Sequence, residues 1–156
     1  MHTDKIGIHE PTRHPQNDEL IIGSIIFNAH DLGGHAAARR LWKTYFANVN
    51  AIIFLVDSTD VARLPEARDE LNKLLITEEL KGIPFLILGN KIDSSAAISL
   101  ERLKYELGLD IHTTGKINQK QIQSNQQNQQ PLEIFMCSVV KRAGYSEGFK
   151  WLSQFI

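Results

Sequence analysis

The sequence has 156 residues, of which 42% are hydrophobic and 22% charged, and its formal net charge is −1. This length fits a single domain, and the composition is ordinary for a soluble globular protein. Lys and Arg form no basic stripe, so the composition does not indicate a nucleic-acid partner. The single cysteine, Cys137, excludes an internal disulfide and indicates a reducing compartment.

No segment has the pattern of a membrane span or of a targeting signal. The longest apolar runs, at 51–56 and 84–88, are too short to cross a bilayer. No apolar run follows the first charged residues, as a signal peptide requires, and His2 stands where N-myristoylation needs a glycine. We therefore expect a cytoplasmic protein.

The first third of the chain is expected to form a loop, a hairpin and a helix. Residues 1–19 are polar and rich in turn formers, which is typical of a loop. Apolar residues at 20–22 and 25–27 flank a Gly-Ser pair, which predicts two short strands in a hairpin, the second ending at Asp31 and the glycines after it. Helix formers with apolar residues at helical spacing predict a helix over 36–46.

The remaining two thirds alternate between strands and helices. Apolar runs predict strands at 51–56, 83–88 and 132–137, and the first of these is expected to be covered on both faces. The segments 64–80, 99–107 and 147–156 are predicted to be helices, with Ser99 as the N-cap of the second. This alternation indicates an α/β fold with a mainly parallel sheet and helices on both faces.

One segment departs from this pattern. Residues 117–130 are dominated by Gln and Asn, which predicts a flexible loop insertion. The sequence shows no internal repeat. We therefore expect one domain over 1–156 that carries this Gln/Asn-rich insertion.

Polar and glycine-rich clusters follow three of the predicted strands. They lie at 31–35, 90–93 and 137–139. Ligands of open α/β sheets bind at the carboxyl ends of the strands, so these clusters are candidates for one binding site.

The cluster at 90–93 has the pattern Asn-Lys-x-Asp. The Asp93 carboxylate can accept hydrogen bonds from the N1–H and the N2 amino group of guanine, a pair of donors that adenine lacks. Asn90 can tie neighbouring loops together, and the Lys91 stem can lie along the plane of a base. Taken alone, the motif is equally compatible with a polar turn at a strand end.

The cluster at 31–35 has the pattern Asp-x-x-Gly-His. Asp31 can reach Mg²⁺ through water, and Gly34 lets a backbone N–H approach a phosphate. His35 can orient an attacking water, since phosphoryl transfer depends on positioning. Thr12, in a proline-rich loop, can add a hydroxyl ligand to Mg²⁺. Each of these residues, taken alone, is also compatible with an ordinary turn or loop.

In this order and at these strand ends, the motifs resemble those of the Sar-type small GTPases of the COPII coat, in the Arf/Sar branch of the Ras-like GTPases. The resemblance covers nearly the whole chain. The segments that carry it are Pro11-Thr12 with His14-Pro15, 31–35 followed by 38–43, 54–57, 86–93, 113–116, and 135–139 with Gly144-Tyr145.

The resemblance implies a P-loop NTPase-like G domain that binds GTP or GDP with Mg²⁺ and hydrolyses GTP. It implies a role in COPII coat assembly for transport from the endoplasmic reticulum to the Golgi, at the cytosolic face of the membrane. Its partners would be the inner-coat subunits, an exchange factor, a GTPase activator and a membrane surface. The site residues would be His35 for catalysis, Thr12 and Asp31 for the metal, and Gly34, Asn90, Lys91, Asp93, Cys137, Ser138 and Val139 for the nucleotide.

The sequence departs from this family at the phosphate-binding loop. It contains no G-x-x-x-x-G-K-[ST], the motif whose backbone N–H groups and lysine cradle the phosphates. By the resemblance, we expect an incomplete domain without the first strand, the P-loop and the N-terminal amphipathic helix. Two strand edges would then lack their partner, and we expect a chain that is poorly stable or aggregates.

Three interpretations therefore remain open. The chain is part of a Sar-type GTPase, or it is a short pseudo-GTPase or interaction module that occupies coat partners without holding GTP, or it is an α/β domain with chance motifs. The intact Asp31, His35, Asn90 and Asp93 favour the first, because a protein that does not bind nucleotide could have lost any of them.

Overall fold

The computed structural model describes residue 12 and residues 16–22, 25–109 and 130–156. The expected insertion at 117–130 therefore lies outside the described residues, except for Gln130. The chain forms two compact units, Met1–Asn48 and Val49–Ile156, which are described separately below. Within the described residues, no helix combines the length and the apolar character that crossing a bilayer requires.

The first unit contains an antiparallel hairpin of β1 (Gln16–Ile22) and β2 (Ile25–Asp31). Ile22 pairs with Ile25, and Gln16 pairs with Asp31 at the open end. The hairpin expectation is confirmed, but the assignment of 16–19 to a loop is wrong. Cross-strand pairing continues through the polar residues because β2 offers a partner at every position, for example Asn28 opposite Glu19.

The helix expected over 36–46 is much shorter in the structure. Only α1 (Ala36–Arg39) is α-helical, and 3-10 turns follow at Trp42–Thr44 and Phe46–Asn48. The indole N–H of Trp42 donates to the carbonyl of Gly33 at 3.0 Å. Apolar spacing alone does not reveal this change, since 3-10 turns place apolar residues at nearly the same intervals.

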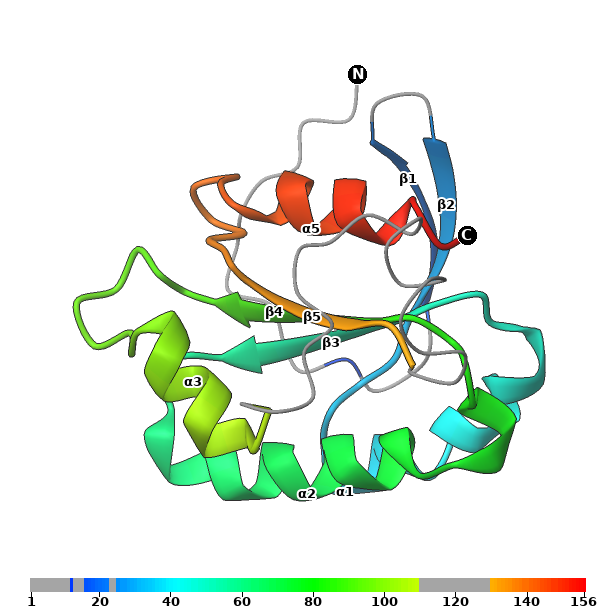
Figure 1. The fold of residues 1–156 in the computed structure, drawn as a ribbon, viewed down its shortest axis with the longest axis horizontal. Helices are drawn as coiled ribbons and strands as arrows, with labels where there is room; N and C mark the ends of the chain where they lie inside the picture. Colours follow the sequence, from blue (N-terminus) through cyan, green and yellow to red (C-terminus); the bar gives the residue numbers. More distant parts are fainter. Residues whose placement is uncertain (1–11, 13–15, 23–24, 110–129) are drawn as a thin grey trace, which may run out of the picture. The chain divides into compact units, whose positions relative to one another are not determined.

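The second unit is a three-layer α/β arrangement (Figure 1). Its sheet has the order β3-β4-β5, with β3 (Ile52–Asp57), β4 (Phe85–Asn90) and β5 (Leu132–Met136) all parallel. The helices α2 (Leu64–Leu75) and α3 (Leu100–Leu107) lie on one face of this sheet, and α5 (Tyr145–Leu152) lies on the other. The expectation of a parallel sheet with helices on both faces is confirmed.

The core of the second unit lies on both faces of the central strand. Every residue of β4 from Phe85 to Gly89 is buried, as the continuous apolar run predicts. Gly148 in α5 allows close packing, since a Cβ there would lie 3.0 Å from a methyl group of Leu86. Ser99 caps α3 as expected, because its hydroxyl accepts the N–H of Arg102.

The expectation for the first strand of this sheet is wrong in one respect. β3 is an edge strand that pairs with β4 only, among the described residues. Its side chains alternate in burial, and Ile53 and Leu55 are 39% and 56% exposed. An edge strand receives less cover from the flanking helices than a central strand, so the apolar run is not covered on both faces here.

Candidate guanine-nucleotide site

The candidate site residues of the second unit lie at the carboxyl ends of the three parallel strands, where the arrowheads of β3 and β4 point in Figure 1. β3 ends at Asp57, β4 ends at Asn90, and Cys137 follows β5. Parallel strands in register bring their ends to one edge of the sheet. Consequently, segments that are far apart in the sequence meet at this edge.

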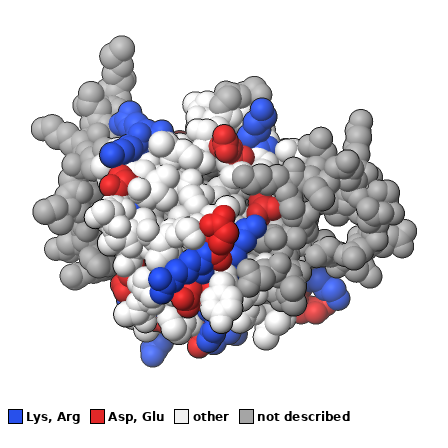
Figure 2. All heavy atoms as spheres, turned by 60° about the vertical axis from the view of Figure 1, so that its left-hand side comes forward, with Lys and Arg blue, Asp and Glu red and all other residues white. Residues whose placement is uncertain are grey.

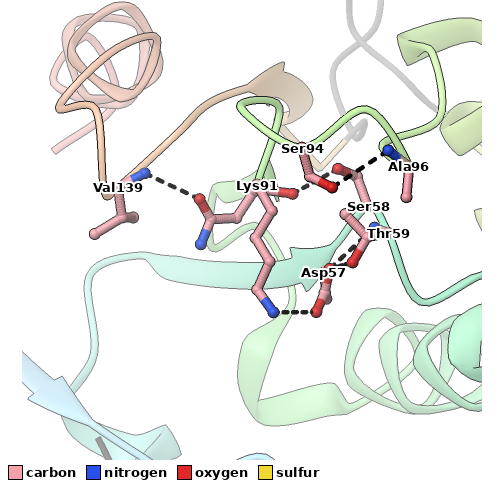
Figure 3. Close-up of polar contacts among 8 residues, drawn as sticks. Asp57, Ser58, Thr59, Lys91, Ser94, Ala96 and Val139 are labelled. Atoms are coloured by element: carbon pink, nitrogen blue, oxygen red, sulfur yellow. Dashed lines mark hydrogen bonds and ion pairs between the residues drawn. The ribbon is translucent and has the colours of Figure 1, made fainter. Parts of the chain in front are cut away.

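Asn90 joins the loops after all three strands. Its side-chain oxygen accepts the backbone N–H of Val139 at 3.0 Å, which links the end of β4 to the loop after β5 (Figure 3). Its backbone carbonyl accepts the N–H and the hydroxyl of Ser58, at 3.0 and 2.5 Å, which links it to the loop after β3. The structure thus gives Asn90 the loop-tying contacts that its place in the motif predicts.

Asp93 lies beside Ser138. The Ser138 hydroxyl donates to Asp93 Oδ1 at 2.5 Å and accepts the backbone N–H of Lys141 at 3.0 Å. Ser138 is fully buried, whereas Asp93 is exposed. The hydrogen bond from Ser138, with the nearby charges of Lys141 and Lys91, holds the pKa of Asp93 below its usual value. Asp93 is therefore ionised near neutral pH and acts only as a hydrogen-bond acceptor.

Cys137 connects the end of β5 to the loop after β4. Its backbone N–H donates to the carbonyl of Gly89 at 2.8 Å, and its own carbonyl accepts the N–H of Ile92 at 3.2 Å. The thiol lies 3.8 Å from the side-chain oxygen of Asn90, and burial raises the pKa of this thiol. Cys137 is thus a neutral, buried part of the frame that holds the loops after β4 and β5 together.

Lys91 extends toward the end of β3 (Figure 3). Its ammonium lies 2.6 Å from Asp57 Oδ2, and its backbone has a positive φ of 72°. Sequence reasoning gave Asp57 no role in the site. The available signal was its position, because Asp57 ends an apolar strand, as Asn90 does.

The candidate residues of the first unit also lie near one another. The Thr12 hydroxyl donates to Asp31 Oδ2 at 3.2 Å, so both predicted metal ligands present oxygen atoms at one place. Gly33 permits this approach, because a Cβ there would clash with the carbonyl of Thr12. No cluster of three or more His, Cys, Asp or Glu side chains suited to a metal ion occurs among the residues that the structure describes.

Two oxygen donors fit Mg²⁺ in a nucleotide site. This ion usually takes one or two protein oxygens and completes its shell with water and substrate phosphates. Gly34 is exposed, and among the described residues no atom beyond its chain neighbours lies within 4 Å of the place where its Cβ would be. Thr12, Asp31 and Gly34 are thus compatible with the predicted metal and phosphate roles.

His35 is the N-cap of α1. Its Nδ1 accepts the backbone N–H of Ala38 at 3.1 Å. In the neutral ring, an accepting Nδ1 leaves the proton on Nε2. The cap fixes the orientation of the imidazole and leaves Nε2–H as the hydrogen-bond donor of the ring.

The surface at the carboxyl edge carries charges of both signs. On the face shown in Figure 2, Lys and Arg side chains are interspersed with Asp and Glu. Exposed apolar side chains of this edge include Ile92, Val139 and Val140, at 41%, 50% and 54%. Exposed apolar side chains in the same loops as an ionised acceptor, Asp93, suit a flat heterocycle that carries hydrogen-bond donors.

A parallel α/β sheet with an Asn-Lys-x-Asp turn and a Ser-containing loop at its carboxyl edge defines the class of Ras-like small GTPases. The comparison with protein families gives the same result. Residues 1–156 match the ADP-ribosylation factor (Arf) family, and the chain belongs to that family.

Curated relatives lie within the same class. The chain is 46% identical to the small COPII coat GTPase SAR1 of Giardia intestinalis over 147 residues, which is 94% of this chain and 74% of that protein. It is 39% identical to the small COPII coat GTPase SAR1 of Nicotiana tabacum over 155 residues, covering 98% of this chain and 78% of that protein.

A solved structure supports the fold. The Arl6 BBS3 small GTPase of Trypanosoma brucei, with the nucleotide analogue GppNp bound, aligns with a TM-score of 0.74 at 30% identity. The alignment covers 96% of this chain and 83% of that one. The expected Arf-like GTPase fold is therefore confirmed.

Proposed function

We propose that this protein is a guanine-nucleotide switch of the Sar type that acts in COPII coat assembly. The observation that carries the proposal is the Asp93–Ser138 pair. It places an ionised carboxylate at the carboxyl edge of a parallel sheet, beside the loop that Asn90 anchors. The names and identities of the two SAR1 relatives support the same function.

The carboxylate explains the preference for guanine. Asp93 is an acceptor only, and guanine presents two adjacent donors, N1–H and the N2 amino group. Adenine presents an unprotonated N1 in the corresponding position, so two acceptors would face each other. The loop after β5 lies beside this carboxylate, because Asn90 Oδ1 accepts the backbone N–H of Val139 at 3.0 Å and Ser138 donates to Asp93. The carboxylate thus matches the donor edge of guanine and opposes that of adenine.

For the first unit we propose that Thr12 and Asp31 hold Mg²⁺ and that Gly34 admits a phosphate. The metal would neutralise charge on the phosphates. His35 would orient the attacking water through Nε2–H, since its Nδ1 is occupied by the N–H of Ala38. These assignments make GTP hydrolysis the proposed reaction of the switch.

The Sar assignment also names partners and a location. We propose inner-coat subunits of COPII, an exchange factor, a GTPase activator and the cytosolic face of endoplasmic-reticulum and Golgi membranes. The first two relatives carry COPII in their names, and this chain shares about two fifths or more of its residues with each. The location follows from this proposed role in transport.

One observation favours a second candidate function. The 156 residues contain no G-x-x-x-x-G-K-[ST], so the phosphates lack their usual backbone cradle within this sequence. A chain with the base site but without that cradle would act as a nucleotide-deficient module that binds coat partners. The two candidates differ in phosphate and Mg²⁺ dependence, not in base preference.

Nucleotide titration of the purified 156-residue chain tests both candidates. We expect ligand-observed NMR to show that GMP binds at least about tenfold more tightly than AMP, since one mismatched hydrogen-bond set costs about 1.4 kcal/mol or more. A chain that treats the two nucleotides alike would refute the guanine site.

A fluorescent GDP analogue, titrated with and without Mg²⁺, separates the candidates. Without the phosphate cradle we expect no Mg²⁺-dependent binding tighter than about millimolar for the chain as written. Micromolar binding that requires Mg²⁺ would show that other residues replace the cradle, and it would favour the switch over the module. A binding assay with purified COPII inner-coat subunits tests the partner, and absence of binding would contradict the coat role in either case.

A further inference from the structure

Lys91 has a strong partner outside its own motif. Its ammonium lies 2.6 Å from Asp57 Oδ2, at the end of the neighbouring strand β3 (Figure 3). The preceding residue, Asn90, directs its side chain to the other neighbour, the loop after β5. Two consecutive residues thus reach in opposite directions from the end of one strand.

Asp57 is itself firmly held. Its other oxygen, Oδ1, accepts the backbone N–H and the hydroxyl of Thr59, at 2.9 and 2.6 Å. Its side chain is 35% exposed, and that of Lys91 is 53% exposed. The carboxylate therefore has one oxygen fixed by its own turn and presents the other to Lys91.

Both members of the pair are charged near neutral pH. Burial raises the pKa of Asp57, but hydrogen bonds from Lys91 and Thr59 outweigh this effect and leave the pKa below its usual value. The hydrogen bond and the charge of Asp57 raise the pKa of Lys91. Since the ammonium charge is matched by Asp57, Lys91 contributes mainly its aliphatic stem to the surface at the carboxyl edge.

We propose that Asp57 is a positioning residue of the guanine site, which holds the Lys91 stem as a preformed platform for the face of the base. This proposal rests on the proposed function. Lysine has four rotatable side-chain bonds, and fixing them before the ligand arrives removes an ordering cost from binding. The positive φ of Lys91 fixes the direction in which the side chain leaves the turn, and Asp57 fixes its far end.

The test is a GMP titration of variants of the 156-residue chain, followed by ligand-observed NMR. Asp57→Asn keeps an oxygen for the Thr59 contacts but removes the charge that holds Lys91. We expect it to weaken GMP binding about threefold to tenfold, the range that ordering one long side chain costs. Glu106→Gln is the matched control, because Glu106 is a partly buried carboxylate that pairs with Arg102 on α3, and we expect it to leave GMP binding unchanged.

A double-mutant cycle separates positioning from a structural role. When Lys91→Met is already present, we expect Asp57→Asn to weaken GMP binding by less than about twofold, because no ammonium remains to be held. An equal loss in both backgrounds, or no loss in the wild-type background, would overturn the proposal.

A second pair of variants keeps the proposal testable should Asp57→Asn fail to fold. Lys91→Arg retains a stem and a cation for Asp57, and we expect GMP binding within about twofold of wild type, whereas Lys91→Met should lose about threefold or more. Equal GMP binding by Lys91→Arg and Lys91→Met would overturn the proposal.

A wild-type chain that does not distinguish GMP from AMP would overturn the proposed function, and this proposal with it. A selective wild type with an unaffected Asp57→Asn overturns the positioning role alone.

Discussion

The Ser138 hydroxyl and the Asp93 carboxylate lie 2.5 Å apart, and this contact joins the loop after β5 to the loop after β4. The same hydroxyl accepts the N–H of Lys141, so it has a donor role and an acceptor role at once. Ser138 is 1% exposed, which means that these bonds form away from water. A buried hydroxyl with both roles filled fixes the orientation of the carboxylate that is proposed to recognise guanine.

Replacing this hydroxyl should therefore impair both stability and binding. Ser138→Ala leaves the N–H of Lys141 without its acceptor, which should lower the free energy of unfolding by about 1–3 kcal/mol. We also expect GMP binding to weaken severalfold, because Asp93 loses the partner that orients it. Urea unfolding and GMP titration measure the two effects. Ser153→Ala, at the C-cap of α5, removes a hydroxyl that only donates to the carbonyl of Lys150, and as the control it should change GMP binding little and stability less than Ser138→Ala does. Unaltered GMP binding by Ser138→Ala would contradict this role.

Asp93→Asn should abolish the preference for guanine. An amide offers one acceptor and one pair of donors, and its NH₂ group would oppose a guanine donor. We expect GMP binding to fall at least about tenfold, with AMP binding little changed. Asp69→Asn, on the exposed side of α2, removes one negative charge without touching the site and serves as control. Retained GMP selectivity in Asp93→Asn would show that another group reads the base.

Much of the second unit could be predicted from its sequence because its strands are continuous apolar runs. Phe85–Asn90 is buried almost throughout, and its end is where Asn90 and Lys91 enter the site. The rule that ligands meet the carboxyl ends of parallel strands then places Asn90, Asp93 and Ser138 at one edge. The pairing of Asp93 with Ser138 itself could not be predicted, because it depends on the path of two loops.

Other features depend on tertiary context that apolar spacing does not carry. The segment after Ala36 turns into 3-10 structure, where the Trp42 indole bonds to Gly33. The run 51–56 looks fully buried in sequence, yet Ile53 and Leu55 are exposed at a sheet edge. The contact of Lys91 with Asp57 joins residues that are distant in the sequence, so no local pattern reveals it.

The Asp57–Lys91 pair should give stability a specific pH dependence. The folded pKa of Asp57 lies below its usual value, so its contribution is present above the unfolded pKa and is lost as pH falls through the folded one. The raised pKa of Lys91 means that the pair also weakens at high pH, once pH rises through that folded value.

We therefore expect Asp57→Asn to be less stable than wild type near neutral pH and equally stable in strong acid. Urea unfolding near pH 7 and near pH 2 measures this difference, where the second value lies below the carboxylate range. Asp69→Asn is the control, and its difference from wild type should be small at both pH values, since its ion pair is exposed. If the difference in free energy of unfolding between Asp57→Asn and wild type is the same at both pH values, ionisation of Asp57 is not the cause of that difference.

The loop after β5 depends on Gly144. This glycine has a φ of 85°, and a Cβ there would clash with the carbonyl oxygen of Met136. Gly144→Ala should destabilise the second unit by about 3 kcal/mol or more, because backbone strain and a backbone clash add. Gly82→Ala is the matched control. Gly82 also has a positive φ, 78°, but in the described part of the chain no atom beyond its neighbours lies within 4 Å of the place where its Cβ would be, so we expect a loss of about 1 kcal/mol. If urea unfolding shows that Gly144→Ala and Gly82→Ala lose the same free energy of unfolding, the clash with Met136 is ruled out.

The outer edge of β3 should make the isolated chain associate with itself. Among the described residues, β3 pairs with β4 alone, and its residues before Asp57 carry no charge. Edge strands without charged or proline residues pair readily with other chains. We expect sedimentation velocity to show association that increases with protein concentration. A wild-type chain that stays monomeric and unfolds reversibly in one step would contradict this expectation.

Leu55→Lys should reduce this association, because Leu55 is 56% exposed on the edge strand and a charge there opposes strand pairing. The cost in stability should be small, since little apolar area leaves the core. Ile76→Lys adds the same charge at a more exposed position, 83%, at the end of α2. If the edge of β3 is responsible, Leu55→Lys reduces association and Ile76→Lys does not. Equal reduction by both variants would instead point to a general effect of net charge, because only one of the two positions can interrupt a strand ladder.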